Sequence, residues 1–278
     1  MGNDGRRRTV VRILVFAAAV NAVAWLGSLL GGDPTSIGPG FIVWGIAPIL
    51  VAVVMSLVKR DWKALGARPN FRSNGRFYIL SILAYPVTIL VVLLLGLLLS
   101  ASRLEAFSAT EFISAFIPLL VIFLLFAIFE EVGWRGYLAP KVYSLGINRY
   151  VSHAIVGVIW ASWHLPYIRE LWAHSVEGVA TLLPRFIIGT FVFAIVYGEI
   201  RIRTGSFWPA VLMHWIGNAI GNTLLTGYAG RGFVTLTPGR EFFGSFGIDG
   251  VFMIVLFGIL GLLLAGKRPT DASEVDKK

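Results

Sequence analysis

Long apolar runs recur along this chain of 278 residues and restrict it to very few folds. A helix needs roughly 20 apolar residues to cross a bilayer core about 30 Å thick. Eight runs qualify: residues 10–30, 41–58, 77–99, 112–129 (continuing through 138), 151–172, 182–200, 207–225 and 250–265. Only helices and closed barrels satisfy their backbone hydrogen bonds in lipid. The sequence therefore predicts an all-α, polytopic membrane protein with about eight transmembrane helices, in which residues 1–278 form a single integral membrane domain.

The composition agrees with a chain embedded in a membrane. Hydrophobic residues make up 56% of the sequence and charged residues 14%, whereas roughly a quarter of an average soluble domain is charged. The net charge of +9 could indicate nucleic-acid binding, but the basic residues lie in short loops and form no basic face. We therefore interpret them as topology signals and expect no nucleic-acid partner.

The distribution of Lys and Arg predicts the orientation, because cytoplasmic loops carry an excess of both. If the N-terminus is cytoplasmic and all eight runs cross, 19 of the 24 Lys and Arg residues lie inside and five outside. This favours a multi-pass protein of the cell membrane with both termini cytoplasmic. Membrane lipids are the expected partners, and the basic loop 59–76 is expected to lie on their headgroups. The first run could also be a cleaved signal peptide, but it continues to residue 30, which is long for a signal.

Acidic residues inside the apolar runs are few. A charged side chain near the bilayer centre costs about 2.5–3.5 kcal/mol on insertion scales, which makes such residues functional suspects. Glu130 and Glu131 are adjacent within the long fourth run. Glu199 and Asp249 sit at the ends of runs, where we expect water to reach them. The absence of Cys excludes disulfides, thiol nucleophiles and Cys-ligated metals.

The four histidines divide in the same way. His164 and His214 lie inside the fifth and seventh runs, whereas His153 and His174 lie near the ends of runs. A histidine inside an apolar helix needs a polar neighbour, because lipid cannot solvate it. His164 and His214 therefore join the two glutamates as candidate site residues.

Helical spacing groups the polar residues further. Residues four apart share a helix face, which places Arg135 beside Glu131 and Asn218 beside His214. Glu130 points about 100° away from Glu131, so we expect its carboxylate to remain unpaired and to face a polar cavity. The simplest arrangement is one water-accessible pocket shared by three helices.

Such a pocket suits hydrolysis. A carboxylate can act as the general base for water, and a histidine can orient that water or pass a proton to the leaving amine. A second histidine and an asparagine amide can stabilise an oxyanion. The same residue types also match catalytic zinc, with Glu130, His164 and His214 as possible ligands and the other glutamate as base. The residues alone do not separate these two mechanisms.

Three short motifs occur in order on these runs: Glu130-Glu131-Val-Gly-Trp-Arg135, Trp160-Ala-Ser-Trp-His164 and His214-Trp-Ile-Gly-Asn218. They resemble the Glu-Glu-x-x-x-Arg, Phe-x-x-x-His and His-x-x-x-Asn motifs of the type II CAAX prenyl endopeptidase family, also called CPBP or Abi intramembrane proteases. Each motif is weak alone, but all three in order form a specific pattern. The resemblance covers roughly residues 113–225, which it implies are the protease core.

The resemblance implies a role for each matching residue. Glu130 would activate water with His164 as its partner, and His214 and Asn218 would stabilise the oxyanion. Glu131 and Arg135 would brace the site. The family is also described as metalloproteases, so the resemblance keeps Zn²⁺ open as a cofactor. The departure is Trp160, which stands where the family pattern has Phe; both are large aromatics that can pack beside the base.

The leading hypothesis is therefore an intramembrane endopeptidase that cuts membrane-anchored or lipid-modified, CAAX-like proteins. A proton-coupled transporter is one alternative, although we find no internal repeat of the kind that transporters show. A non-catalytic scaffold or immunity protein of the same family is another. Trp134, Trp163 and Trp215 are expected to serve packing or interface anchoring, and the Gly-rich stretch 227–250 to be a plain connector.

Overall fold

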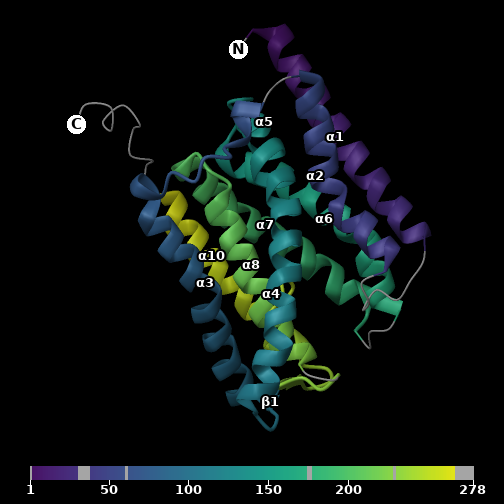
Figure 1. Cartoon of the computed structure of the whole chain (residues 1–278), viewed down its shortest axis with the longest axis vertical. Helices are drawn as coiled ribbons and strands as arrows, with labels where there is room; N and C mark the ends of the chain where they lie inside the picture. Colours follow the sequence, from purple (N-terminus) through teal and green to yellow (C-terminus); the bar gives the residue numbers. More distant parts are fainter. Residues whose placement is uncertain (1, 31–37, 60–61, 174–176, 228–229, 267–278) are drawn as a thin grey trace.

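The structure, a computed structural model, describes residues 2–30, 38–59, 62–173, 177–227 and 230–266 (Figure 1). His174 lies outside the described residues. Within them, a long helix covers each predicted run: α1 Asn3–Leu29, α2 Pro39–Lys59, α3 Phe71–Leu98, α4 Ala109–Glu131, α6 Arg149–Ala173, α7 Val179–Thr204, α8 Trp208–Thr226 and α10 Val251–Gly266. The helical prediction is thus confirmed, with boundaries that shift by a few residues.

Several short elements interrupt this pattern. The fourth run is not one continuous α-helix: α4 is followed by a π-helical segment, η2 (Val132–Leu138), and then by α5 (Ala139–Tyr143). A 3₁₀ turn, η1 (Trp62–Leu65), precedes α3. The stretch 227–250 is more than a plain connector, because it contains β2 (Val234–Leu236) and α9 (Glu241–Gly244). Strand β2 pairs antiparallel with β1 (Ser102–Leu104), which places Arg103 opposite Thr235.

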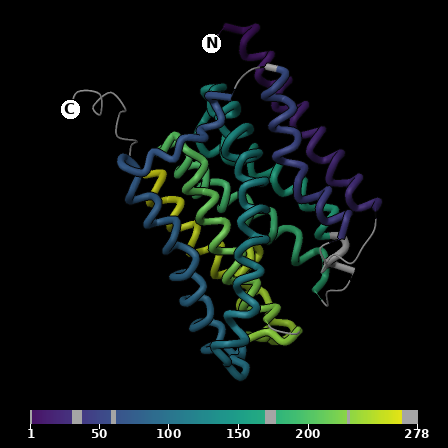
Figure 2. Tube along the Cα trace, viewed as in Figure 1, coloured from purple at the N-terminus to yellow at the C-terminus, as the bar shows by residue number. Residues whose placement is uncertain are grey.

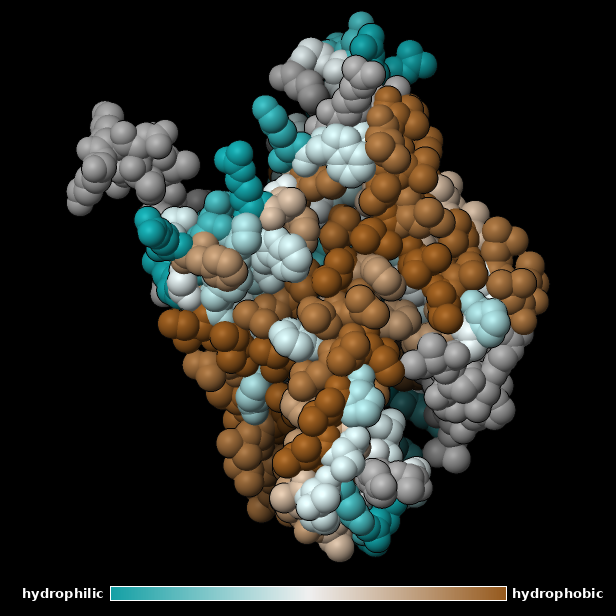
Figure 3. Space-filling view, viewed as in Figure 1, coloured by the Kyte–Doolittle hydropathy of each residue, from teal (hydrophilic) through white to brown (hydrophobic). Residues whose placement is uncertain are grey.

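The helices form a membrane protein. Five stretches are long and apolar enough to cross a bilayer: Asn3–Leu29, Pro39–Val58, Phe71–Leu98, Ala109–Tyr143 and Val179–Thr204. Helix α10 is apolar but shorter, and α6 and α8 are the helices that carry His164 and His214. Figure 3 shows a broad apolar belt between two polar ends. The chain is therefore an all-α, polytopic membrane protein, as predicted.

Helix packing brings distant motifs together. Helix α4 packs along α8, α6 packs along α7, and α7 also packs against α10 (Figure 2). The N-terminus and α5 lie at one end of the molecule, with β1 at the opposite end (Figure 1). Phe16 of α1 is fully buried and stacks on Tyr137 of η2, with ring centroids 5.1 Å apart. The π-helical segment thus sits inside the bundle and packs against α2, α6 and α7.

Candidate active site

The two adjacent glutamates are the last residues of α4, directly before the π-helical segment. All seven residues of η2 are buried. Gly133 permits a close approach to α2, because a Cβ there would lie 2.5 Å from the Cβ of Pro48. π-Helical turns are rare and frequently occur at functional sites. The local structure therefore places the two glutamates directly beside a type of helical turn that is associated with functional sites.

Glu131 joins two motifs. Its Oε1 accepts a hydrogen bond from Nη1 of Arg135 at 2.9 Å, and Nδ1 of His214 lies 2.9 Å from the same oxygen. Glu131 and Arg135 are both fully buried, and His214 is 7% exposed. Because the carboxylate only accepts, Nδ1 of His214 carries the proton. The predicted pair of Glu131 and Arg135 is thus present, and it also fixes His214.

The guanidinium of Arg135 lies between two aromatic rings. Its Cζ is 4.3 Å from the ring centroid of Trp160 and 4.5 Å from that of Tyr197. Attraction between a cation and the face of an aromatic ring is strongest when both are shielded from water. The two rings therefore hold the plane of the guanidinium while Nη1 pairs with Glu131.

Glu130 is not unpaired, contrary to our expectation. Its Oε2 accepts hydrogen bonds from two indoles, from Nε1 of Trp160 at 3.0 Å and from Nε1 of Trp134 at 3.3 Å. Its Oε1 lies 3.6 Å from Nε2 of His214, which is too long for a direct hydrogen bond. Glu130 is 5% exposed. Two donors thus fix one oxygen of this carboxylate, and the other oxygen faces His214.

The remaining predicted residues, Asn218 and His164, lie on α8 and α6, the helices that also carry His214 and Trp160. Asn218 follows His214 by one turn of α8 and is half-buried. On α6, Nδ1 of His164 lies 2.9 Å from the backbone oxygen of Trp160. A carbonyl oxygen only accepts, so Nδ1 donates and Nε2 is left as an acceptor. Aromatic rings surround His164: Trp163 at 4.6 Å, Phe186 at 5.2 Å and Trp44 at 5.9 Å between centroids.

The possible zinc ligands are not gathered into one cluster of three. Among the residues that the structure describes, no group of three or more His, Asp or Glu side chains is arranged to hold a metal ion. Nδ1 of His214 bonds to Glu131, and Nδ1 of His164 bonds to a backbone carbonyl, so only Nε2 of each ring could bind a metal ion.

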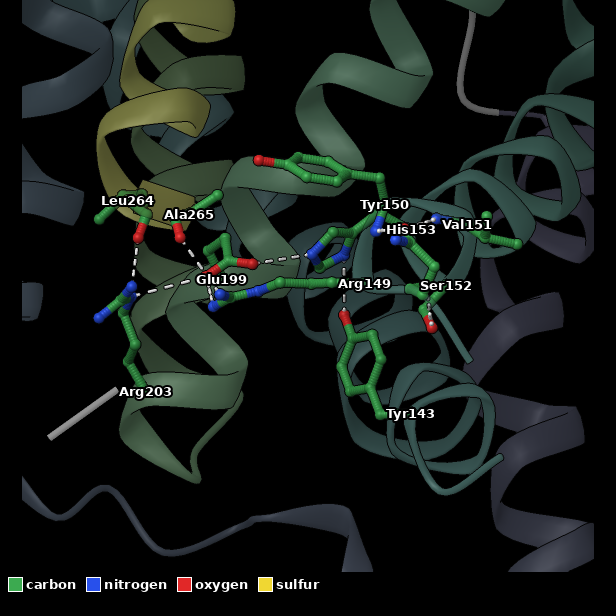
Figure 4. Close-up of polar contacts among 11 residues, drawn as sticks. Tyr143, Arg149, Tyr150, Val151, Ser152, His153, Glu199, Arg203, Leu264 and Ala265 are labelled. Atoms are coloured by element: carbon green, nitrogen blue, oxygen red, sulfur yellow. Dashed lines mark hydrogen bonds and ion pairs between the residues drawn. The ribbon is translucent and has the colours of Figure 1, made fainter. Parts of the chain in front are cut away.

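A second polar cluster lies at the end of α7, and here another expectation is wrong. Glu199 is fully buried and does not reach water. Its Oε1 accepts from Nε2 of His153 at 2.9 Å, and its Oε2 pairs with Arg149 (Figure 4). Tyr143 in turn bonds Nδ1 of His153 at 3.2 Å. Glu199 is at the end of its predicted run, but α6 and α5 cover it.

We expect Glu199→Gln to lower the free energy of unfolding. Any catalytic activity, measured per folded molecule, should stay unchanged. Breaking a buried ion pair costs about 3–5 kcal/mol, and the side chain of Arg149 is 28% exposed, so a loss of about 2–4 kcal/mol is expected. Thermal unfolding in detergent measures it. The control is Glu111→Gln, whose partner Arg231 is 63% exposed. A wild-type thermal unfolding midpoint together with a loss of catalytic activity would instead show that Glu199 takes part in catalysis.

Sequence reasoning missed Trp134 and Tyr197 as residues of the site, and it expected Trp160 only to pack beside the base. Trp134 and Trp160 donate to Glu130, and Tyr197 lies against Arg135. The sequence alone predicts a packing or anchoring role for Trp134. A signal was present, because Trp134 follows Glu130 by four residues and Trp160 precedes His164 by four. An indole on the same helix face as a buried carboxylate can donate its Nε1–H to that carboxylate.

Comparison with known proteins confirms the resemblance seen in the motifs. Residues 112–220 match the family described as type II CAAX prenyl endopeptidase Rce1-like, and all three motifs lie inside that segment. A CAAX prenyl protease 2 of Methanococcus maripaludis is 34% identical over 88 residues, which are 31% of this chain and 32% of the relative. A lysostaphin resistance protein A of Staphylococcus haemolyticus is 27% identical over 179 residues, 63% of this chain and 46% of the relative. The matches thus span less than half of either relative.

Proposed function

We propose that this multi-pass, Rce1-like membrane protein is an endopeptidase in which Glu130 activates the hydrolytic water. The observation that carries the proposal is the position of one imidazole between two carboxylates. The ring nitrogens of His214 lie 2.9 Å from Glu131 and 3.6 Å from Glu130. Burying such a cluster is costly, and carboxylate–imidazole pairs are the usual agents of general acid–base catalysis.

In the proposed reaction, Glu130 takes a proton from water while the water oxygen bonds to the scissile carbonyl carbon. The C–N bond then breaks, and Glu130 returns that proton to the leaving amine. The two indole donors occupy Oε2. Oε1, the oxygen nearer His214, therefore accepts the proton from water.

We assign oxyanion stabilisation to His214 and Asn218. Nδ1–H of His214 is used by Glu131, so Nε2 must carry a second proton to donate to the oxyanion. With both nitrogens protonated, Arg135 and His214 balance the two buried carboxylates, which lowers the cost of burying them. The amide of Asn218 supplies a second donor from the same face of α8. His164 offers Nε2 as an acceptor that can orient the water.

We propose that the substrates are membrane-anchored or lipid-modified proteins of the CAAX type, because the archaeal relative is named a CAAX prenyl protease. The glutamates are followed directly by η2 and α5, at the end of the molecule that holds the N-terminus (Figure 1). The excess of Lys and Arg assigns that end to the cytoplasm. The scissile bond would then be reached from the cytoplasmic side of the cell membrane.

A second candidate function is a resistance or immunity role without proteolysis. The observation that favours it is the match over 63% of this chain to a protein named for lysostaphin resistance. The two candidates differ in one respect that is easily measured, because only the first requires a peptide bond to be cut.

The experiment is cleavage of a panel of membrane-anchored peptides, prenylated and unmodified, by the purified protein in lipid nanodiscs. We expect cleavage of at least one lipidated peptide, identified by mass spectrometry. Chelator should leave the rate unchanged, because the described side chains form no metal site. Loss of activity with chelator and its return with zinc would contradict the metal-free chemistry. If none of the peptides were cut, the result would favour the resistance or immunity role.

We expect Trp160→Phe to lower kcat by about 10- to 100-fold, the effect of losing one hydrogen bond to a charged group at about 1.5–3 kcal/mol. Phe retains a ring beneath Arg135 but removes the Nε1–H donor to Glu130. The matched control is Trp215→Phe, which removes an indole bond to the backbone oxygen of Leu120. Equal rates for the two variants would show that the indole donor does not matter.

A further inference from the structure

Arg135 is held by two residues of α7 that lie one helical turn apart. Nε of Arg201 donates to the backbone oxygen of Arg135 at 2.8 Å, and the ring of Tyr197 packs against its guanidinium. Tyr197 and Arg201 are both buried. We propose that Arg201, with Tyr197, is a positioning residue that holds Arg135 in place and, through it, aligns Glu131 and His214. This inference rests on the proposed protease function.

The sequence explains why the carbonyl of Arg135 needs an outside donor. In a π-helix each carbonyl accepts from the N–H five residues later, and for Arg135 that residue is Pro140, which has no N–H. The N–H of Ala139, four residues later, bonds to the oxygen of Trp134. A buried carbonyl without a partner is unfavourable. Arg201 supplies the hydrogen bond that the helix cannot.

Arg201 is itself fixed at its other end. Its Nη2 donates to the backbone oxygen of Ala64 at 3.1 Å, in the segment 62–69 of the basic loop 59–76. Gly66 has φ +73°, and a Cβ there would lie 2.6 Å from Nη2 of Arg201. Nε1 of Trp208 holds the same segment by donating to the oxygen of Ala67 at 2.7 Å. The guanidinium therefore bridges two backbone carbonyls and cannot swing freely.

The contacts form one continuous series. Arg201 bonds to the backbone of Arg135, Arg135 pairs with Glu131, and Glu131 bonds to Nδ1 of His214. Each contact is a charge-assisted hydrogen bond, and bonds of this kind are strong and directional. Loss of the hydrogen bond from Arg201 to Arg135 should thus displace the imidazole of His214 that faces Glu130. Arg201 acts on this imidazole through Arg135 and Glu131.

The test compares Arg201→Ala and Arg201→Lys with wild type in lipid nanodiscs. We expect Arg201→Ala to lower kcat by about tenfold or more, as for loss of a bond from a charged donor, with KM within about twofold. Arg201→Lys should restore part of kcat, because its ammonium keeps one donor. The matched control is Arg203→Lys, on the same helix, where Arg203 donates to the backbone oxygen of Leu264. Its kcat should stay at the wild-type value.

A double variant separates positioning from general stability. If Arg201 acts through Arg135, adding Arg201→Ala to Arg135→Lys should lower kcat less than Arg201→Ala does alone. Equal and additive losses, or losses that only follow the folded fraction, would overturn the proposal.

Amide hydrogen exchange gives a readout that does not depend on proteolysis. We expect residues 132–138 to exchange faster in Arg201→Ala than in Arg203→Lys, because the first variant removes the bond to η2. Unchanged exchange would overturn the positioning role even if the protein is an active protease. Faster exchange in a protein that cuts no peptide would support the positioning role and contradict the proposed function alone.

Discussion

Replacing Glu130 with Gln should abolish peptide cleavage while the protein stays folded. Gln keeps an acceptor for the indoles of Trp134 and Trp160, so the local packing survives. It cannot take a proton from water, and general-base catalysis contributes typically 10²–10⁴-fold, so we expect a loss of about 10³-fold in kcat. Steady-state cleavage of the best lipidated peptide measures it, with the thermal midpoint recorded for the same preparation.

The control for this variant is Glu111→Gln. Glu111 lies in the first turn of α4 and pairs with Arg231 in an exposed ion pair. Exposed pairs contribute about 0–1 kcal/mol, so this variant should cleave at the wild-type rate. If Glu130→Gln cleaved at the wild-type rate, Glu130 would not be the general base, and Glu131 and His164 would become the candidates for that role. A loss of activity accompanied by unfolding would instead show that Glu130 is needed for the fold.

The fold was predictable because lipid imposes a simple rule on the chain. A helix must cover each long apolar run, and helices such as α8 and α10 follow the predicted runs closely. The π-helical segment was not predictable from hydropathy, since hydropathy does not distinguish π-helical from α-helical turns in residues 132–138. It depends on tertiary contacts, such as the close approach of Gly133 to Pro48 and the stacking of Phe16 on Tyr137.

The candidate site was predictable where the interaction is local. Glu131 and Arg135 are four residues apart on one chain segment, and their pair is present. Spacing along one helix does not reveal a donor that comes from another helix, and for this reason Glu130 was expected to be unpaired. Trp160 lies 30 residues away in sequence from the carboxylate that it contacts. The burial of Glu199 was missed for the same reason, because His153 and Arg149 belong to α6.

Arg135→Ala should be the most destabilising single change in the site. Removing one partner of a buried ion pair costs about 3–5 kcal/mol, because the other charge is left uncompensated. Both side chains of this pair are fully buried, and the cavity between Trp160 and Tyr197 would add to the loss. We expect a large fall in the thermal midpoint together with loss of cleavage. The control is Arg231→Ala, which breaks the exposed pair with Glu111 and should cost about 0–1 kcal/mol.

A double variant separates the two contributions of Arg135. In Glu131→Gln/Arg135→Met both charges are gone and the volume is roughly kept, and such replacements are often neutral for stability. We therefore expect the thermal midpoint to recover towards wild type while cleavage stays absent, because His214 loses the carboxylate that fixes its Nδ1. Recovery of both properties would make the ion pair purely structural. Recovery of stability alone would mean that the chain keeps a costly buried pair because the pair orients the imidazole facing Glu130.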